Sequence, residues 1–327
     1  MTRAGRAAGW TVIAVLAGLA AAAPFVAPAE PWRQHADLAY APPMRPRVVD
    51  ADGRLRTPFV YPMLLQDRLE RRYVADVSRP APLQFFTRGR LASTDATTWF
   101  PLGADPLGRD VFSRIAYGAR WSLSVAITAT LLAMGVGALA GAVAGYSGGW
   151  TDRIITTVAD FVVILPAAYV IVTLRASLPL VLSTAQVFWT MVLVLAAASW
   201  PLPARGVRSI IAAERRREYA EAAYAVGAGR LRILLRHLLP ATRSHLTAQA
   251  FLLFPAFILA EATLSFLGLG FAEPSASWGV MLQDAGRISA ITEAPWMLAP
   301  AGAIVAAVLA FKLVVSREAD SESVIRL

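Results

Sequence analysis

The sequence contains no cysteine, a single lysine and only three histidines. The lack of cysteine excludes disulfide bonds, thiol catalysis and thiolate metal sites. The only lysine, Lys312, follows Phe311 and is not in a Gly-Lys-Ser/Thr sequence, so the chain has no Walker A loop for the phosphates of ATP. The histidines, His35, His237 and His245, lack metal-ligand spacing. We therefore expect no cofactor or metal in this chain, and any ATP-driven work would need a separate ATPase subunit.

Charge is also scarce. Of the 327 residues only 16% are charged and 57% are hydrophobic, and the mean hydropathy is +0.53. A soluble globule of this size needs more polar surface. Six runs with little charge reach or approach the roughly 20 residues that a helix needs to cross the hydrocarbon core. They are residues 7–29, 121–151, 154–174, 176–204, 244–272 and 294–311. We therefore expect an all-α polytopic membrane protein with six transmembrane helices.

Basic residues in the short loops predict the orientation. With a cytoplasmic N-terminus, the inside segments carry 15 basic residues, nine of them between Arg205 and Arg243, and the short outside loops carry only Arg175 and Arg287. This positive-inside bias predicts that both termini are cytoplasmic. The 14 arginines of residues 30–120 do not oppose it, because long translocated segments are largely exempt. Since basic residues occur on both sides of the membrane, nucleic acid is not an expected partner.

The first 120 residues divide into a hydrophobic segment and a polar insert. Residues 1–29 are interpreted as an uncleaved first span, with a cleaved signal peptide as the alternative. Residues 30–120 form a predicted extracytoplasmic insert that is too long for an ordinary connection. Asp52-Gly53, between Val48-Val49 and Leu55, predicts a hairpin turn. The insert is therefore either a small strand-containing subdomain or an extended loop held on the membrane domain.

Residues 102–123 predict a short amphipathic helix at the membrane interface. Its apolar face is Val111, Ile115 and Ala119, and its basic residues are Arg109, Arg114 and Arg120. These arginines are expected to reach lipid headgroups. The helix is interpreted as an interfacial anchor, and contact with substrate is the alternative.

Several residues in the predicted spans suggest helix packing or translocation. Gly137, Gly141 and Gly145 form a tandem small-xxx-small stripe that lets another helix approach closely. Asp160 and Glu261 are costly charges inside spans, so they line a translocation path or hold helices together. The prolines at 166, 201, 203 and 255 are expected to kink or end spans. Residues 145–149 also match the hydrolase pattern G-x-S-x-G, but that motif needs a preceding strand and His and acid partners, so we reject it.

The polar segment 205–243 lies between two membrane-length apolar runs. Good helix formers at residues 210–226 predict a helix that ends at Gly227 and Gly229, where the chain can take positive φ. A second short helix should then carry one apolar face and end at Pro240. The apolar residues of that face are Leu231, Leu234, Leu235 and Leu238. The sequence predicts a helix-turn-helix that hangs from the membrane.

Within this segment the sequence resembles the hallmark of the permease subunits of ATP-binding-cassette importers. The matching residues are Glu221-Ala222-Ala223, Gly227 and Leu239-Pro240, with Glu218 one turn earlier. Residues 102–123 and 260–279 are similar to the dipeptide, oligopeptide and nickel branch, so the resemblance covers most of residues 100–315. It implies a type I importer permease domain over residues 121–315. It also implies that the loop 205–243, through the seven residues named here, is the coupling element that docks on a cytoplasmic ATPase. The tail, residues 316–327, departs from the family ending.

The resemblance implies a complex that lies in the cytoplasmic membrane and contacts membrane lipid. The other subunits would be a second homologous permease, two cytoplasmic ATPases that bind ATP-Mg and an extracytoplasmic solute-binding protein. The implied cargo is di- or oligopeptides, with nickel or another metal chelate as the alternative. Closure of the ATPases on ATP would switch the spans between inward-open and outward-open states. A secondary transporter or channel, and a membrane-anchored scaffold acting through residues 31–100, are the remaining classes. The first should show inverted repeats, which are not visible, and the second would not need five further spans.

Overall fold

The computed structural model describes residues 3–315 except 69, 96, 166–172, 174–181 and 287–291. The chain divides into two compact units. The insert unit comprises residues 2–124 and 259–313, and the loop unit comprises mainly residues 125–258. Helices α3 (Val111–Ser147) and α10 (Arg243–Phe266) each contribute to both units.

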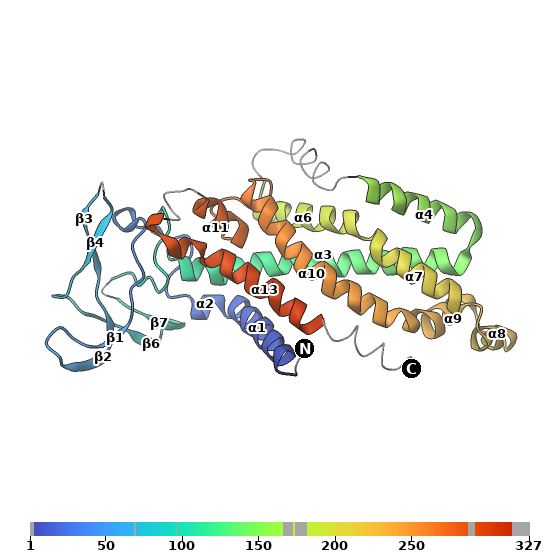
Figure 1. The fold of residues 1–327 in the computed structure, drawn as a ribbon, viewed down its shortest axis with the longest axis horizontal. Coiled ribbons are helices and arrows are strands. Elements are labelled where there is room, and N and C mark those ends of the chain that lie inside the picture. Colours follow the sequence, from blue (N-terminus) through green and yellow to red (C-terminus); the bar gives the residue numbers. More distant parts are fainter. Residues whose placement is uncertain are drawn as a thin grey trace. The chain divides into compact units, whose positions relative to one another are not determined.

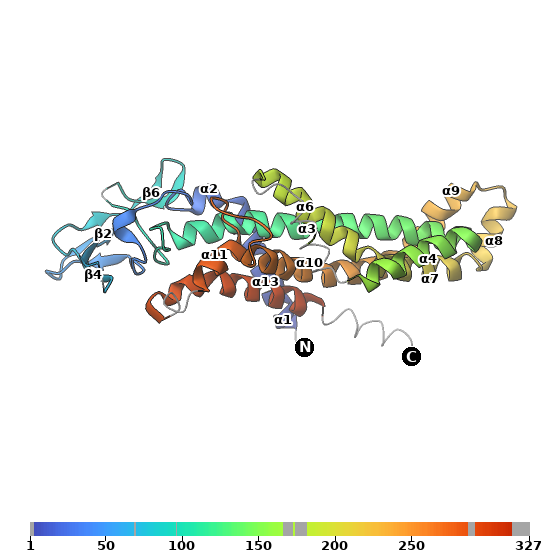
Figure 2. The ribbon, with the colours of Figure 1, turned by 90° about the horizontal axis from the view of Figure 1, so that it is seen from above.

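The helices of the insert unit come from both ends of the chain (Figures 1 and 2). Besides parts of α3 and α10, they are α1 (Arg3–Ala21), α2 (Ala23–Val26), the 3-10 helix η1 (Ala36–Leu38), α11 (Trp278–Ala285), the 3-10 helix η4 (Pro295–Leu298) and nearly all of α13 (Ala299–Val315). One apolar core joins the start of α3 to α11 and η4. Its buried residues include Tyr40, Val111, Ile115, Met281 and Met297.

Short antiparallel strands fill the middle of the insert. They are β1 (Arg47–Val49), β2 (Leu55–Val60), β3 (Met63–Asp67), β4 (Arg72–Ala75), β5 (Ala81–Pro82), β6 (Gln84–Thr87) and β7 (Arg90–Ser93). They pair as a sheet in the order β1-β2-β5 and as the hairpins β3-β4 and β6-β7. The β1-β2 turn contains the predicted Asp52-Gly53 pair, and Gly53 has φ 76°. Of the two alternatives for this segment, the strand-containing one describes it.

The loop unit is helical. In addition to parts of α3 and α10, it contains α4 (Gly149–Ile164), α6 (Thr184–Ser199), α7 (Pro201–Glu214), α8 (Glu218–Ala225), α9 (Arg230–Ile233), the π-helix η2 (Leu234–Leu238) and the 3-10 helix η3 (Leu239–Thr242). Ser183 and Gln186 form a capping box that starts α6. Pro201 stands in the first turn of α7, where its missing N–H costs nothing.

Four described helices are long and apolar enough to cross a membrane: residues 4–21, 111–147, 230–266 and 295–314. Helices α6 and α7 would together form a fifth span, bent by 43° at the break before Pro201. The protein is therefore a multi-pass membrane protein, as predicted. The count of six remains a prediction, because the second half of the third expected span lies outside the described residues. So do Pro166, Arg175, Arg287 and the tail.

The prediction of a separate short helix over residues 102–123 is wrong. Helix α3 begins at Val111 and continues without a break to Ser147. Gly118 lies inside this helix and does not interrupt it. A Cβ there would lie 3.2 Å from the Trp278 side chain, so the glycine leaves room for that indole. The expected amphipathic segment is thus a loop followed by the first turns of a membrane-length helix.

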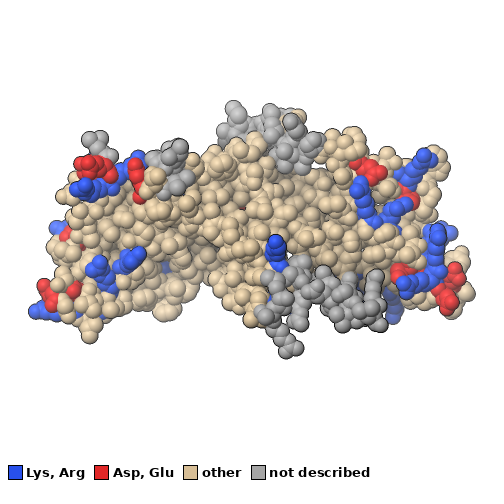
Figure 3. Space-filling view, viewed as in Figure 1, with Lys and Arg blue, Asp and Glu red and all other residues tan. Residues whose placement is uncertain are grey.

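Charged side chains are unevenly distributed in each unit. On the face drawn in Figure 3 they gather over the strands in the insert unit and over α4 and α7 to α9 in the loop unit. The remaining helical surface on this face is nearly free of them. This distribution suits helices whose sides face lipid and whose connections face water.

Candidate functional site

The predicted helix over residues 210–226 is interrupted. Helix α7 ends at Glu214 and α8 begins at Glu218, with Arg215, Arg216 and Arg217 between them. The guanidinium of Arg215 donates to the carbonyl of Tyr146, and Glu214 pairs with Arg217 at 3.1 Å. These side-chain contacts favour a turn where propensity alone favours a helix.

A phenol fixes the same turn. The Tyr219 hydroxyl donates to Glu214 Oε2 at 2.6 Å. Partial burial, followed by the hydrogen bond to this carboxylate, raises the pKa of Tyr219 to about 12. The hydroxyl therefore stays protonated and keeps donating at any physiological pH.

Gly227 ends α8 in the predicted way. Its φ of +86° closes the helix, and the N–H of Ala228 donates to the carbonyl of Ala223 at 3.0 Å. A Cβ at this position would meet nothing within 4 Å, so only the backbone conformation requires glycine here. Gly229 has φ −65° and does not need to be glycine, which makes that half of the prediction wrong.

The returning helix does not end at Pro240. It passes from α9 through the π-helical turn η2 and the 3-10 turn η3 into α10. Pro240 lies where the hydrogen-bond pattern changes, so its missing N–H interrupts no regular α-helical ladder. The chain therefore forms one continuous helical segment over residues 230–266.

The loop has a buried apolar face and an exposed one. Ile233 and Leu238 are buried with Val207, Ile211 and Ala220, which joins α7, α8 and the returning helix in one core. The predicted apolar face is wrong for two of its members, because Leu231 and Leu235 are exposed. The most exposed large apolar side chains of the loop are Tyr224 (64% exposed), Val226 (88%), Leu231 (68%) and Leu235 (54%). Exposed apolar residues clustered on one polar loop are typical of a protein interface.

The remaining residues of the resemblance lie around this core. Glu218 and Glu221 occupy the first turn of α8, where carboxylates favour the helix dipole. Glu221 lines a cavity of about 480 Å³ together with Tyr146, Arg215 and Arg230. Ala222 is exposed, whereas Ala223, Leu239 and Pro240 are partly buried.

The three glycines of α3 lie against α7. A Cβ at Gly137 would come within 2.6 Å of the Pro203 ring, one at Gly141 within 2.4 Å of the Ala204 carbonyl, and one at Gly145 within 2.5 Å of the Arg208 carbonyl. Real Cβ atoms do not approach this closely. The stripe therefore brings the two helix backbones together.

Two ion pairs connect α4 to α7. Asp160 pairs with Arg205 at 2.6 Å, and both side chains are partly exposed. Asp152 accepts from Nη2 of Arg208 at 2.6 Å and also from its Nε. Asp160, a predicted charge inside a span, is therefore neutralised by a neighbouring helix.

Glu261 lies in the insert unit and is fully buried. Its Oε1 accepts from the Ser265 hydroxyl at 2.8 Å, and the hydroxyls of Ser122 and Ser277 lie around the same carboxyl group. Trp278, which follows Ser277 in the sequence, is also fully buried and donates through its Nε1 to the Ile115 carbonyl at 3.1 Å. Glu261 thus sits where α3, α10 and α11 meet.

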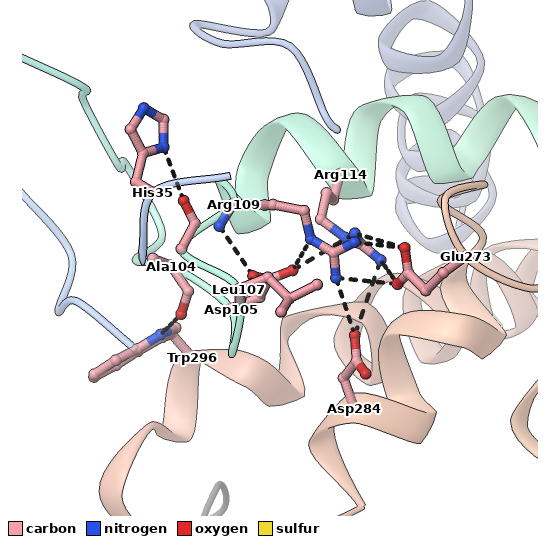
Figure 4. A network of polar contacts seen from close by, with 10 residues as sticks. His35, Ala104, Asp105, Leu107, Arg109, Arg114, Glu273, Asp284 and Trp296 are labelled. Atoms are coloured by element: carbon pink, nitrogen blue, oxygen red, sulfur yellow. Dashed lines mark hydrogen bonds and ion pairs between the residues drawn. The ribbon is translucent and has the colours of Figure 1, made fainter. Parts of the chain in front are cut away.

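A cluster of charged side chains surrounds the start of α3 (Figure 4). Arg109 donates to Asp105 Oδ2 at 2.6 Å and to both carboxylate oxygens of Glu273, at 2.5 and 3.0 Å. Arg114 donates to Glu273 at 2.8 Å, and Asp284 lies 3.4 Å from Arg109. Both guanidinium groups are almost completely buried. The prediction that Arg109 and Arg114 reach lipid headgroups is therefore wrong, and only Arg120 of the three is exposed.

The carboxylates of the cluster differ in their proton affinity. Burial raises the pKa of Glu273, but the hydrogen bonds from Arg114 and Arg109 outweigh it and lower the pKa overall. The pKa of Asp284 is raised, mainly by burial and then by the negative charges of Glu273 and Asp105. Three carboxylates face two guanidiniums, and of Glu273 and Asp284 it is Asp284 whose negative charge is disfavoured.

Comparison with known proteins identifies the family. The family model described as binding-protein-dependent transport system inner membrane component matches residues 137–317. The chain belongs to this family. The dipeptide transport system permease protein of Alkalihalophilus pseudofirmus is 37% identical over 226 residues, which cover 69% of this chain and 71% of that protein. The oligopeptide transport system permease protein of Bacillus subtilis is 35% identical over 217 residues, covering 66% and 68%. The nickel transport system permease protein of Escherichia coli is 37% identical over 225 residues, covering 69% and 78%.

The predicted membership among importer permeases is thus confirmed. The matched segment begins within α3 and extends past α13. The family match favours this class over a secondary transporter and over an anchored scaffold. Sequence reasoning missed the charge cluster of this permease. Asp105, four residues before Arg109, was the one local signal for it, while Glu273 and Asp284 lie far along the chain.

Proposed function

We propose that this permease moves di- or oligopeptides across the cytoplasmic membrane, with both termini on the cytoplasmic side. Two relatives that it resembles over two thirds of its length are named as dipeptide and oligopeptide permeases. A relative named as a nickel permease makes a metal chelate the second cargo to test. Uptake of a labelled dipeptide and of nickel by the assembled transporter separates the two. Nickel uptake without peptide uptake would contradict the peptide assignment.

The work of transport is assigned to separate subunits. The complex would contain this chain, a second homologous permease, two ATPases that bind ATP-Mg and an extracytoplasmic solute-binding protein. The chain alone should show no ATP hydrolysis above a mock preparation, since its only lysine is outside any Walker A sequence. Hydrolysis by the isolated polypeptide would contradict this division of labour.

The loop from Glu218 to Pro240 is proposed as the element that couples the permease to its ATPase. The observation that supports it is the exposure of Val226 and Leu231 at the tip of a loop whose opposite face is packed on α7. Exposed apolar side chains of this size gain free energy when a partner covers them, at about 25 cal/mol for each Å² removed from water. Glu218 and Glu221, at the positive end of α8, would supply charged contacts to the same partner.

Two glycines provide a matched test. Gly227→Val forces a β-branched residue into φ +86°, which costs about 1–3 kcal/mol, whereas Gly229→Val enters an extended conformation that valine prefers. A Cβ at either position would meet no atom within 4 Å. We expect Gly227→Val to reach the membrane at normal levels while transport and transport-stimulated ATP hydrolysis fall together, and Gly229→Val to keep most of both. Equal activity of the two variants would refute the role of the turn.

A direct test of the interface uses Val226→Asp. This side chain is 88% exposed, so the substitution should not disturb folding of the permease. Val77→Asp in the insert, at a position 58% exposed, is the control. We expect loss of ATPase co-purification only for Val226→Asp, and retention by both variants would contradict the proposed surface.

For the intramembrane residues we propose structural roles. Asp160 would hold α4 on α7, Glu261 would hold α3, α10 and α11 together, and the stripe of Gly137, Gly141 and Gly145 would set the distance between α3 and α7. The support is the ion pair of Asp160, the full burial of Glu261 and the short Cβ distances at the glycines. A translocation role would instead require these residues to face the substrate.

A further inference from the structure

A polar pocket lies between the segment that follows α2 and the residues of and after the β6-β7 hairpin. It has a volume of about 200 Å³ and its lining includes Arg33, Arg88, Arg90, Thr94 and Asp95. We call it the arginine pocket. No sequence motif marks this pocket, and none of its lining residues belongs to the loop from Glu218 to Pro240.

The positive charge of the pocket exceeds its negative charge. Arg88 pairs with Asp95 at 3.0 Å, and Arg90 is 3.9 Å from Glu30. Arg33 has no ion-pair partner within the described part of the chain. Three guanidiniums thus face two carboxylates, one of which is at the limit of an ion pair, and one arginine remains available for an anion.

A buried hydroxyl also lacks a partner. Thr94 Oγ1 is shielded from solvent and makes no hydrogen bond with the described residues. The arginines of the pocket are therefore its charged donors, and the hydroxyl residues Ser93, Thr94, Thr97 and Thr98 line it as well. This is the donor set that phosphate oxygens accept from.

The position of the pocket is fixed by the first helices of the insert unit. Arg90 Nη1 donates to the carbonyl of Pro28 at 2.5 Å, two residues after α2. Helix α1 is membrane-length and its apolar window ends at Ala21. Phe25 lies four residues beyond that end, in the separate helix α2, and a straight helical continuation at about 1.5 Å per residue would place it about 6 Å further. The headgroup layer outside the hydrocarbon is about 5–8 Å thick on each side, so Phe25 lies within it.

Aromatic side chains surround this level. Phe25 is 40% exposed, and its ring centroid is 6.2 Å from that of Phe86, which is 74% exposed. Phe86 belongs to the β6-β7 hairpin and has φ +57°. Arg88, two residues later in the same hairpin, also has a positive φ, +52°. Such conformations are strained for large side chains and often mark functional segments. Here the strained turn holds a phenylalanine outside the core.

We propose that the arginine pocket binds the phosphate of an anionic phospholipid, with Phe25 and Phe86 inserted among the lipid headgroups at the end of α1. Arg33 and Arg88 contact the phosphate, and Arg90 holds the hairpin against α2. Aromatic rings and arginines at the same depth are the usual combination at a membrane interface. The inference requires that α1 crosses the membrane, but it does not depend on the cargo of the permease or on the coupling loop.

The first arm of the test measures lipid binding to the assembled transporter in neutral detergent. Native mass spectrometry would count bound phosphatidylglycerol in the wild type, in Arg33→Gln/Arg88→Gln and in the control Arg79→Gln. Arg79 is an exposed arginine of the same insert that does not line the pocket. The double variant removes two of the three guanidiniums of the pocket, so it should lose about tenfold or more in affinity while the control changes little. Equal affinities in all three proteins would overturn the proposal.

The second arm separates a lipid from a free anion or a protein partner. Because the chain has no cysteine, Phe86→Cys and Leu55→Cys each introduce a single labelling site. With an environment-sensitive dye in nanodiscs, brominated lipid should quench the label at 86 and not at 55, which is 83% exposed on β2. The absence of quenching at 86 would overturn the proposal. This holds if the pocket instead binds inorganic phosphate, and equally if the solute-binding protein covers the label.

Discussion

The buried charge cluster gives the sharpest prediction about stability. In Arg109→Gln the charge is lost while a side chain of similar length remains. Asp105 is only 2% exposed and would keep a single cationic neighbour, Arg114, at 3.5 Å. Breaking a buried ion pair on one side typically costs about 3–5 kcal/mol. Glu273 is 39% exposed, and water compensates it in part, so the lower end of that range applies, about 3 kcal/mol.

The matched control removes a carboxylate from the same cluster. Asp284 has its pKa raised by burial and by Glu273 and Asp105, so its ionised form destabilises the folded state once the pH exceeds the pKa of the unfolded chain. Asp284→Asn should therefore leave stability at pH 7.5 unchanged or higher. One substitution in the cluster is thus predicted to destabilise and the other to be neutral or stabilising, a difference that a general sensitivity of the region to mutation does not explain.

The assay is thermal unfolding of the purified permease in detergent, followed by size exclusion at a fixed heating rate, because membrane proteins often unfold irreversibly. A cost of about 3 kcal/mol corresponds to a fall of about 6 °C or more for a unit of this size. The reasoning is refuted by an Arg109→Gln melting temperature within 1–2 °C (about 0.5 kcal/mol) of the wild type. It is also refuted if Asp284→Asn lowers stability as much as Arg109→Gln.

Three further predictions concern other parts of the chain. Burial raises the pKa of Asp110 to about 7, so the unfolded chain holds fewer protons than the folded one, and stability should fall as the pH rises from about 4 to 7. Asp110→Asn keeps an acceptor oxygen for the N–H of Ser113 and should remove most of this dependence of the melting temperature on pH, measured from about pH 5 to 8. Gly141→Ala should destabilise by at least about 1 kcal/mol because its methyl group meets backbone at 2.4 Å, whereas Gly135→Ala, with nothing within 4 Å, should be neutral or stabilising; the same melting assay compares them, and equal effects would contradict the packing argument. Single cysteines at the exposed positions Val77 and Val226 should react with impermeant reagents from opposite sides of the membrane, and labelling from one side would disprove the proposed topology.

Apolar runs located most of the membrane helices but not their ends. The first span was expected over residues 7–29, and α1 covers Arg3–Ala21. Composition could not find this boundary, because the following residues are equally apolar. The new helix starts at Ala23 with Pro24 in its first turn, where the proline ring disfavours continuation of the preceding helix. The local chemistry of one proline decides what average hydropathy cannot.

Side-chain partners were the least predictable feature. The spacing of Arg109 and Arg114 beside an apolar stripe predicted contact with headgroups, a reasonable expectation for an isolated helix. Their partner Glu273 lies 164 and 159 residues further along the chain, on the connection between α10 and α11. No local pattern contains that information. Conversely, the conformation of Gly227 was predictable, since positive φ is a property of one residue and its immediate neighbours.

The glycine stripe shows how a local pattern gains its meaning from a distant one. Its spacing predicts a closely packed helix without saying which. In the structure that helix is α7, which also pairs with α4 through Arg205 and Arg208. The core that contains Val207 and Ile211 of α7 extends to Ala142 of α3, to α8 and to the returning helix. Helix α8 is therefore joined to α7 by packing as well as by a three-residue turn. We therefore expect a displacement of α8 to move α7, and through the ion pairs and the close backbone contacts α4 and α3, because a packed core of this kind does not deform continuously.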